Sequence, residues 1–235
     1  MSSPLRTALR LGRVSNLPTV WTNVMAGLAL NGGALEPRVI VPLGVATSLF
    51  YVAGMYLNDA FDWRWDAQHR PERPIPSGEI SAGAVFAAGF AMMAAGLLLL
   101  AFGPGRPAPF FGGLGLGVCI LVYNISHKKN PLAPVVMGLC RVSVYVIAAL
   151  AASSHLTSAV YAGAGLQLVY LIALTLVARH EHKNPRLPRL VGQMIAGISL
   201  LDAAVLLVMG HPVGAAIAAA GFPLTRLFQR RIAGT

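Results

Sequence analysis

The chain has 235 residues, of which 56% are hydrophobic and only 11% are charged, and its mean hydropathy is +0.66. A soluble domain carries about twice that charged fraction, so the composition excludes an ordinary soluble protein and indicates a polytopic membrane protein. The formal net charge is +10. Because the basic residues are scattered over several loops and form no single basic face, we expect no nucleic-acid partner.

Apolar runs long enough to cross a lipid bilayer recur along the whole chain. Runs of roughly 17–25 residues predict eight transmembrane helices, at 14–34, 39–57, 82–102, 109–125, 131–153, 158–177, 190–209 and 212–228. The first run is of full length and no small-residue cleavage pattern closes it, so it does not read as a cleavable signal. We therefore expect one all-α domain over residues 1–235, a polytopic membrane helical bundle.

The distribution of basic residues over the loops predicts the topology. Of the 18 Lys and Arg residues, only Arg38 and Arg106 fall on one side of an eight-span arrangement, and Arg141 falls within a span. The other basic residues all fall on the opposite side. By the positive-inside rule, both termini and the loop after the second helix are cytoplasmic. The expected location is a bacterial inner membrane.

Three of the four aspartates of the chain lie just after the second apolar run, at Asp59, Asp62 and Asp66. Their i, i+3, i+7 spacing places all three on one face if the helix continues past Leu57. Three like charges on one face repel one another unless cations are present. Mg²⁺ prefers carboxylate oxygen ligands and bridges to phosphate oxygens, and Asn58 adds a neutral oxygen ligand.

A solvated polar loop is the alternative interpretation of these acids. In that case Asp59, Asp62 and Asp66 would pair with arginines of the same segment. The candidate arginines are Arg64, Arg70 and Arg73.

The longer segment that contains the aspartates carries a more specific pattern. Residues 58–81 read NDAFDWRWDAQHRPERPIPSGEIS. This segment resembles the first aspartate-rich motif of the UbiA family of intramembrane prenyltransferases, N-D-x-x-D-x-x-x-D followed by R-P-I-P-S-G-x-I-S. Further positions are similar to the family outside this loop: Arg13, Asn16, Tyr123, Lys128, Lys129, Gly138 and Arg141.

The resemblance implies helices around a central cavity, in which Mg²⁺ holds an isoprenyl diphosphate that ionises to an allylic cation and attacks an acceptor. It implies that Asp59, Asp62 and Asp66 are the catalytic metal ligands. The expected diphosphate-binding residues are Asn16, Asn58, Arg70, Arg73, Lys128, Arg141 and Arg179. A diphosphate leaving group gains negative charge in the transition state, where Mg²⁺ and basic side chains stabilise it most.

Arg141 falls in the middle of the fifth predicted span. An arginine at that depth costs several kcal/mol unless it faces the bundle interior and a partner, so a diphosphate in the cavity is one natural partner. Asp202, the lone acid inside the seventh predicted span, is the other. In that alternative the two residues form a structural pair that binds no ligand.

The loop after the sixth predicted helix departs from the family pattern. UbiA proteins carry a second aspartate-rich motif there, whereas residues 178–185 read ARHEHKNP and contain no aspartate. Glu181 is the one acid left to bind a second metal ion, and Arg179 or Lys183 could instead clamp the diphosphate directly. This variant is similar to an EboC-like branch of the family. The chain also has eight predicted spans where nine are usual, and a missing last helix could open one wall of the cavity.

These features predict a Mg²⁺-dependent enzyme that transfers a prenyl group from a polyprenyl diphosphate to an aromatic or other lipophilic acceptor within the bilayer. Because the second motif is degenerate, a catalytically silent member that binds or moves an isoprenoid-linked metabolite is the second hypothesis. An unrelated transporter is the third.

Overall fold

The computed structural model describes residues 3–127, 130–180, 184 and 186–234, and the regular elements of this part are all helical. A short 3₁₀ turn, η1 (Val14–Asn16), follows the first helix. The α-helices are α1 (Pro4–Leu11), α2 (Leu17–Leu30), α3 (Pro37–His69), α4 (Ala82–Phe102), α5 (Ala108–Ser126), α6 (Ala133–Ala152), α7 (Ser158–Ala178), α8 (Leu187–Val208) and α9 (Pro212–Gln229). Each of the eight predicted apolar runs coincides with one of α2 to α9, which confirms the all-α bundle.

Six of these helices, α3 to α8, are long and apolar enough to cross a membrane. The predicted count of eight spans is therefore approximate. α2 has 14 residues and is about 21 Å long at 1.5 Å per residue, shorter than the roughly 30 Å hydrocarbon core. α9 has 18 residues, but its last turns contain Arg226 and Gln229, which lower its hydropathy.

α3 is the longest element, with 33 residues. At 1.5 Å per residue it extends about 50 Å, well beyond one crossing of the hydrocarbon core. Pro37 lies in its first turn, where the missing N–H costs nothing. The helix ends at His69, and the residue that follows precedes Pro71, a position that disfavours helical backbone. The helix thus continues 12 residues past its predicted end at Leu57, and the three aspartates lie on this continuation.

α2 lies at the centre of the bundle, and α3, α6, α8 and α9 pack around it. Val20, Val24 and Leu28 of α2 are fully buried and belong to the main apolar core. The approach of α2 to α6 is close enough to require glycine, because a Cβ on Gly27 would lie 2.6 Å from the Tyr145 carbonyl oxygen. Small residues at such crossings are typical of membrane helices.

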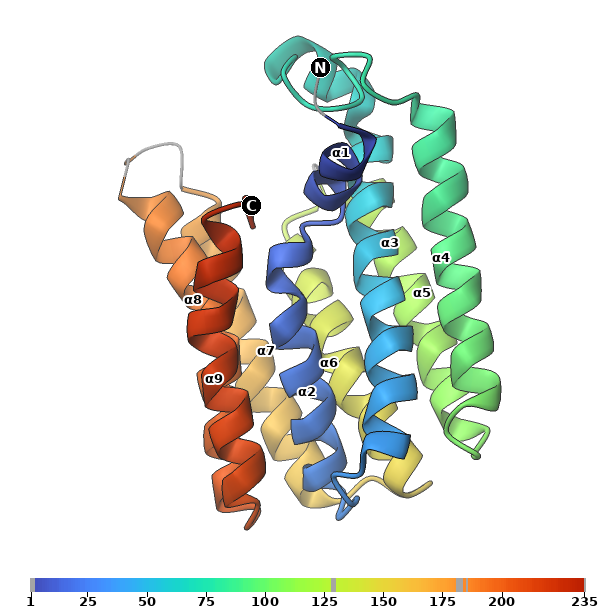
Figure 1. Ribbon diagram of the computed structural model, residues 1–235, viewed down its shortest axis with the longest axis vertical. Coiled ribbons are helices and arrows are strands. Elements are labelled where there is room, and N and C mark those ends of the chain that lie inside the picture. Colours follow the sequence, from blue (N-terminus) through green and yellow to red (C-terminus); the bar gives the residue numbers. More distant parts are fainter. Residues whose placement is uncertain (1–2, 128–129, 181–183, 185, 235) are drawn as a thin grey trace.

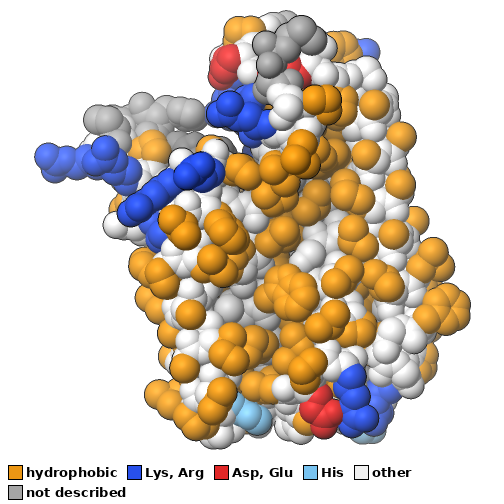
Figure 2. Space-filling model, viewed as in Figure 1, with side chains coloured by type: hydrophobic (Ala, Val, Ile, Leu, Met, Phe, Trp, Pro, Cys, Tyr) orange, Lys and Arg blue, Asp and Glu red, His pale blue; other side chains and the backbone are white. Residues whose placement is uncertain are grey.

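α1 and the C-terminal end of α9 lie toward the same end of the bundle as the loop that joins α3 to α4 (Figure 1). In Figure 2, hydrophobic side chains cover the middle of the molecule, and Lys and Arg side chains gather at the end that carries the termini. This arrangement places the aspartate segment, the termini and most of the basic residues at one membrane boundary.

Candidate active site

Arg73 joins two of the three aspartates at the end of α3. Its Nη1 donates to Asp59 Oδ1 at 3.1 Å and to Asp66 Oδ2 at 2.9 Å. The side chain of Asp66 is 2% exposed and that of Asp59 is 11% exposed. One helical face therefore carries both acids, as their spacing predicts, and a single guanidinium from the following loop neutralises part of their charge.

Asp62 lies on the α5 side of this face. Its Oδ2 is 3.3 Å from His127 Nε2, and His127 is the residue at the C-terminal end of α5. These two residues line a small cavity of about 200 Å³ with Phe61, Asn124 and Ile125. Asp62 thus faces a polar space at the end of the bundle that carries the α3–α4 loop, rather than the apolar core.

Asn58 connects α3 to α5, because its Nδ2 donates to Asn124 Oδ1 at 3.1 Å. This bond uses the amide nitrogen of Asn58. Its Oδ1, the atom that the sequence suggests as a metal ligand, takes no part in it.

Arg13 reaches Asp59 from the other side, with Nη2 3.6 Å from Oδ1. It sits between α1 and η1 with φ 42° and ψ 44°, the left-handed conformation that a non-glycine residue rarely adopts. Such outliers cost on the order of 1–3 kcal/mol and tend to persist at functional sites. The reversal of the chain at this residue allows α1 to lie against the end of α3.

α1 is attached to the loop that joins α3 and α4. Thr7 Oγ1 donates to Glu79 Oε2 at 2.5 Å, and Arg10 Nη1 lies 3.5 Å from Glu79 Oε1. The hydroxyl of Tyr56 donates to the Ala8 carbonyl at 3.1 Å. These contacts hold α1 against the α3–α4 loop, at the end of α3 that carries the aspartates.

The other two arginines that the sequence offered to the acids contact aromatic rings. Arg70 Cζ is 5.8 Å from the ring centroid of Trp65, and Arg64 Cζ is 5.4 Å from that of Trp63. Such stacking holds a guanidinium near the membrane boundary. Arg70 remains beside the site as a predicted phosphate ligand.

Arg141 points toward α2 and α3. It donates through Nη2 to Thr19 Oγ1, and its Cζ lies 5.8 Å from the Tyr51 ring centroid. Its Nε is buried and has no hydrogen-bond partner among the described residues. Asn16 lies beside this group, donating to the Tyr51 hydroxyl at 3.1 Å and to the Gly234 carbonyl at 2.9 Å.

Asp202 binds a different set of residues. Thr22 Oγ1 donates to it at 2.5 Å, Asn23 Nδ2 at 2.9 Å, and the Tyr145 hydroxyl donates as well. Arg141 and Asp202 are both described, and no ion pair within 4.0 Å joins them. A direct ion pair between these residues is therefore not formed, because neutral donors surround the carboxylate of Asp202, although the charge of Arg141 still acts on that carboxylate.

This separation makes a test possible. Arg141→Met should weaken the binding of a prenyl diphosphate by tenfold or more, since one charge-assisted contact is worth about 1.5–3 kcal/mol, as measured by isothermal titration. In a double-mutant cycle with Asp202→Asn, the coupling in unfolding free energy should stay below about 1 kcal/mol. Breaking a buried ion pair costs about 3–5 kcal/mol. A coupling of that size would therefore show that Arg141 and Asp202 interact as an ion pair.

The second polar loop lies only partly within the described residues. The predicted ligands Lys128 and Glu181 fall outside them, as do Lys129, His182 and Lys183. Arg179 is described: it follows the last residue of α7 and is exposed.

Within the described residues, no group of three or more His, Cys, Asp and Glu side chains is close enough to hold a metal ion. Asp59 and Asp66 instead meet at Arg73, while Asp62 turns to His127. The three acids share a face as predicted, but their carboxylates do not converge on one point. Their role as metal ligands stays a prediction.

Sequence reasoning missed several neighbours of the site, namely Asn124, His127, Thr7 and Glu79. The spacing of His127 from Tyr123, four residues, is the one signal in the sequence, since it puts both rings on the same helical face. In the structure the two rings stack at 5.0 Å. Glu79 occupies a variable position of the motif, and nothing in the sequence pairs it with α1.

Comparison with known proteins decides the family. The model of the UbiA prenyltransferase family matches residues 19–231. The chain belongs to the UbiA prenyltransferase family. The resemblance of the aspartate segment to UbiA proteins is thereby confirmed.

Among its UbiA relatives is the digeranylgeranylglyceryl phosphate synthase of Ignicoccus hospitalis, 38% identical over 133 residues, which are 56% of this chain and 42% of the relative. The synthase of the same name from Methanoregula boonei is 31% identical over 166 residues, 66% of this chain and 54% of the relative. Protoheme IX farnesyltransferase 1 of Cenarchaeum symbiosum is 31% identical over 124 residues, 51% and 42% of the two chains. The matches span about half the length of these curated relatives.

A solved structure from a study of digeranylgeranylglyceryl phosphate synthase in membranes has the same fold, with a TM-score of 0.63 and 16% identity. The alignment covers 96% of this chain and 94% of that one. This likeness confirms the UbiA membrane helical bundle as the architecture.

Proposed function

We propose that this protein transfers a prenyl group from a polyprenyl diphosphate to a lipophilic acceptor within the bilayer, with Mg²⁺ as cofactor. The observation that carries the proposal is the end of α3, where Asp59, Asp62 and Asp66 share one face and Arg73 bridges two of them. This acidic and basic mixture at a membrane boundary suits a ligand that combines a charged diphosphate with an apolar tail.

The residues present fit a magnesium ion. Carboxylate oxygen is the ligand type that Mg²⁺ prefers, together with phosphate oxygens and water. Asp62 faces a polar cavity, and Asp59 and Asp66 lie on the same face of α3. Asp59, Asp62 and Asp66 would hold the ion, with Glu181 a candidate for a second one. When bound, the ion would supply positive charge for the departing diphosphate.

Four basic side chains from different parts of the chain are candidates to bind the diphosphate. Arg13 and Arg73 contact the acids directly, and Arg141 presents a buried Nε without a partner in the described part of the chain. Arg179 follows the last residue of α7 and is exposed. These residues would bind phosphate oxygens and hold the diphosphate in one orientation, which favours the transition state because the negative charge there grows as the bond to the prenyl carbon breaks.

The acceptor class follows from the named relatives only as a proposal. Two of the three relatives described above are named for digeranylgeranylglyceryl phosphate, so a prenylated glyceryl phosphate is the first acceptor to test, with aromatic acceptors as the second class. We also propose that the end bearing the termini and the aspartates faces the cytoplasm, because it carries most of the Lys and Arg side chains.

Reconstitution tests the activity. Purified protein in lipid nanodiscs, given Mg²⁺, a panel of prenyl diphosphates of different length and each acceptor class, should release diphosphate and form a prenylated product detected by mass spectrometry. Turnover should vanish with EDTA and return when Mg²⁺ is added. Tight binding of a diphosphate without turnover in any combination would instead identify a silent family member.

A further inference from the structure

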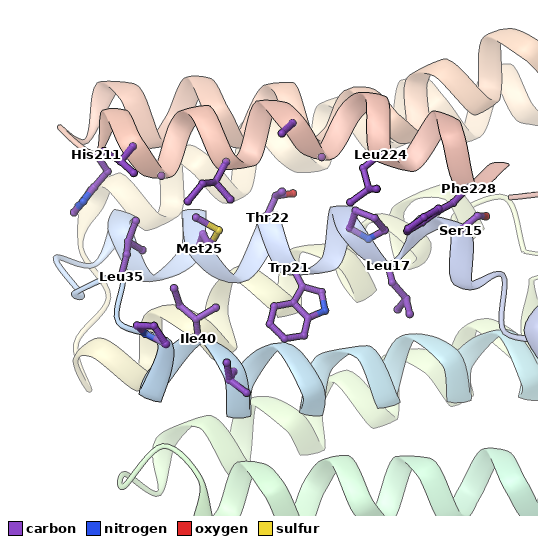
Figure 3. Close-up of a pocket in the computed structure, with 18 of the residues that line it drawn as sticks. Ser15, Leu17, Trp21, Thr22, Met25, Leu35, Ile40, His211, Leu224 and Phe228 are labelled. Carbon is purple, nitrogen blue, oxygen red and sulfur yellow. The ribbon is translucent and has the colours of Figure 1, made fainter. Parts of the chain in front are cut away.

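A long apolar groove lies between α2, α9 and the first turns of α3. α2 forms its floor, and α9 and the first turns of α3 form its walls (Figure 3). Its lining includes Trp21 and Met25 from α2, Ile40 from α3, and Ile217, Leu224 and Phe228 from α9. The cavity volume is about 1300 Å³, larger than the roughly 300–1,000 Å³ of a small-molecule site.

The groove follows α9 over most of its length. Lining residues run from Pro212 to Phe228, 17 positions of one helix, or about 25 Å at 1.5 Å per residue. This distance approaches the roughly 30 Å thickness of the hydrocarbon core. The groove is therefore open to the acyl chains of the bilayer, and its occupant must be apolar over most of its length.

The two ends of the groove differ in charge. Arg231 lines the end near the chain termini, and within the described residues it makes no ion pair and no side-chain hydrogen bond. The opposite end is lined by Pro37 and His211, and the neighbouring Arg38 is paired with Glu36. The lining contains no acidic residue. One end thus offers an uncompensated cation at the membrane boundary, with Arg230 beside it in sequence.

We infer that this groove binds an anionic phospholipid, whose phosphate pairs with Arg231 and whose acyl chains lie along Leu224, Ile217 and Trp21. An arginine guanidinium matches phosphate oxygens in geometry as well as charge, and the anionic leaflet of a membrane attracts basic residues near its surface. The apolar walls of the groove would contact the acyl chains of this bound lipid, in place of the acyl chains of other lipids.

A helix from a second copy of the chain is a poorer occupant. Each copy carries a net charge of +10, so two Arg-rich ends placed side by side would repel. Few acids are available to pair with Arg231, since four of the eight in the chain, Asp59, Asp62, Asp66 and Glu79, already contact basic or polar partners at the aspartate site.

Native mass spectrometry of the purified protein with phosphatidylglycerol and with phosphatidylcholine tests this inference. Wild-type protein should retain phosphatidylglycerol preferentially. Arg231→Gln should lower its apparent affinity about fivefold, as expected for the roughly 1 kcal/mol that one basic residue contributes near an anionic surface. Arg230→Gln, the matched control, removes the same charge beside the groove and should leave retention nearly unchanged. Equal losses in both variants would contradict a specific phosphate contact.

A second variant tests the groove independently of charge. Ile217→Trp should fill the groove and reduce retention of phosphatidylglycerol, whereas Leu207→Trp, at a similarly exposed position on α8, should not. Two results would overturn the inference. The first is a dimer that Ile217→Trp dissociates, since the groove would then be a protein interface. The second is displacement of phosphatidylglycerol by an equal amount of a polyprenyl phosphate, since an isoprenoid would then be the occupant.

Discussion

Replacing Asp202 with Leu should destabilise the bundle more than any other single change on α8. Asp202 is 0% exposed and accepts hydrogen bonds from Thr22, Asn23 and Tyr145. Thr22 keeps a second acceptor, the Thr19 carbonyl at 3.1 Å, but the donors of Asn23 and Tyr145 would be left in an apolar interior. At about 1–3 kcal/mol for each unsatisfied donor, we expect a loss of about 3–5 kcal/mol, visible as a fall of roughly 10 °C or more in the apparent Tm.

Ser199 provides the control for this experiment. It lies one turn before Asp202 on the same helix, is equally buried, and its hydroxyl has no partner in the described part of the chain. Ser199→Ala should therefore leave the Tm unchanged or raise it slightly. If Asp202→Leu were as mild as Ser199→Ala, the hydrogen bonds from α2 and α6 would contribute little to stability.

Neutralising Asp62 should remove Mg²⁺-dependent binding of a prenyl diphosphate while the protein stays folded. Asp62 is the acid that faces the polar cavity rather than Arg73, and an amide cannot offset the charge of a divalent ion. We expect Asp62→Asn to weaken binding at least 100-fold, or about 2.7 kcal/mol, by titration calorimetry at fixed Mg²⁺. The change in Tm should be small, because the side chain lies at the edge of the cavity.

Glu72→Gln serves as the matched acid-to-amide control, since Glu72 belongs to the same motif but is exposed and makes no ion pair with the described residues. Its diphosphate affinity should equal that of the wild type. Unaltered affinity in Asp62→Asn would remove the metal-site proposal and favour a purely structural ion-pair network around Arg73.

The helices could be predicted from the sequence because hydrophobic length alone determines where a chain crosses a bilayer. The range 82–102 coincides with α4. The second helix, predicted to end at Leu57, runs on to His69, because the segment with the aspartates is polar and hydrophobic length does not report a helix outside the bilayer. α2 differs as well. It is shorter than its apolar run 14–34, because η1 takes the first residues and the chain turns at Asn31, whose side chain bonds to the Ala149 carbonyl at 2.9 Å.

The site could be predicted only where its residues are neighbours in the sequence. Arg73 and Asp66 are seven positions apart in one motif, so the sequence could suggest their ion pair. The partners of Asp62 and Arg141 are His127 and Thr19, which come from other helices. Periodicity shows which face of a helix is polar, but the rotation of one helix against another depends on packing that no single stretch encodes. The assignment to an EboC-like branch and the role of Glu181 stay predictions.

The central position of α2 has a consequence for how the protein is made. α2 is synthesised before α3 to α9, yet Thr22 and Asn23 donate to Asp202 on α8. Asn31, which follows α2, donates to the Ala149 carbonyl on α6, and Thr19 accepts from Arg141 on the same helix. A helix of 14 residues that contains three of these polar side chains and is followed by the fourth inserts poorly on its own. Its partner Asp202 on α8 is synthesised more than 150 residues after α2. We therefore expect α2 to pack into the bundle only after the later helices have inserted into the membrane.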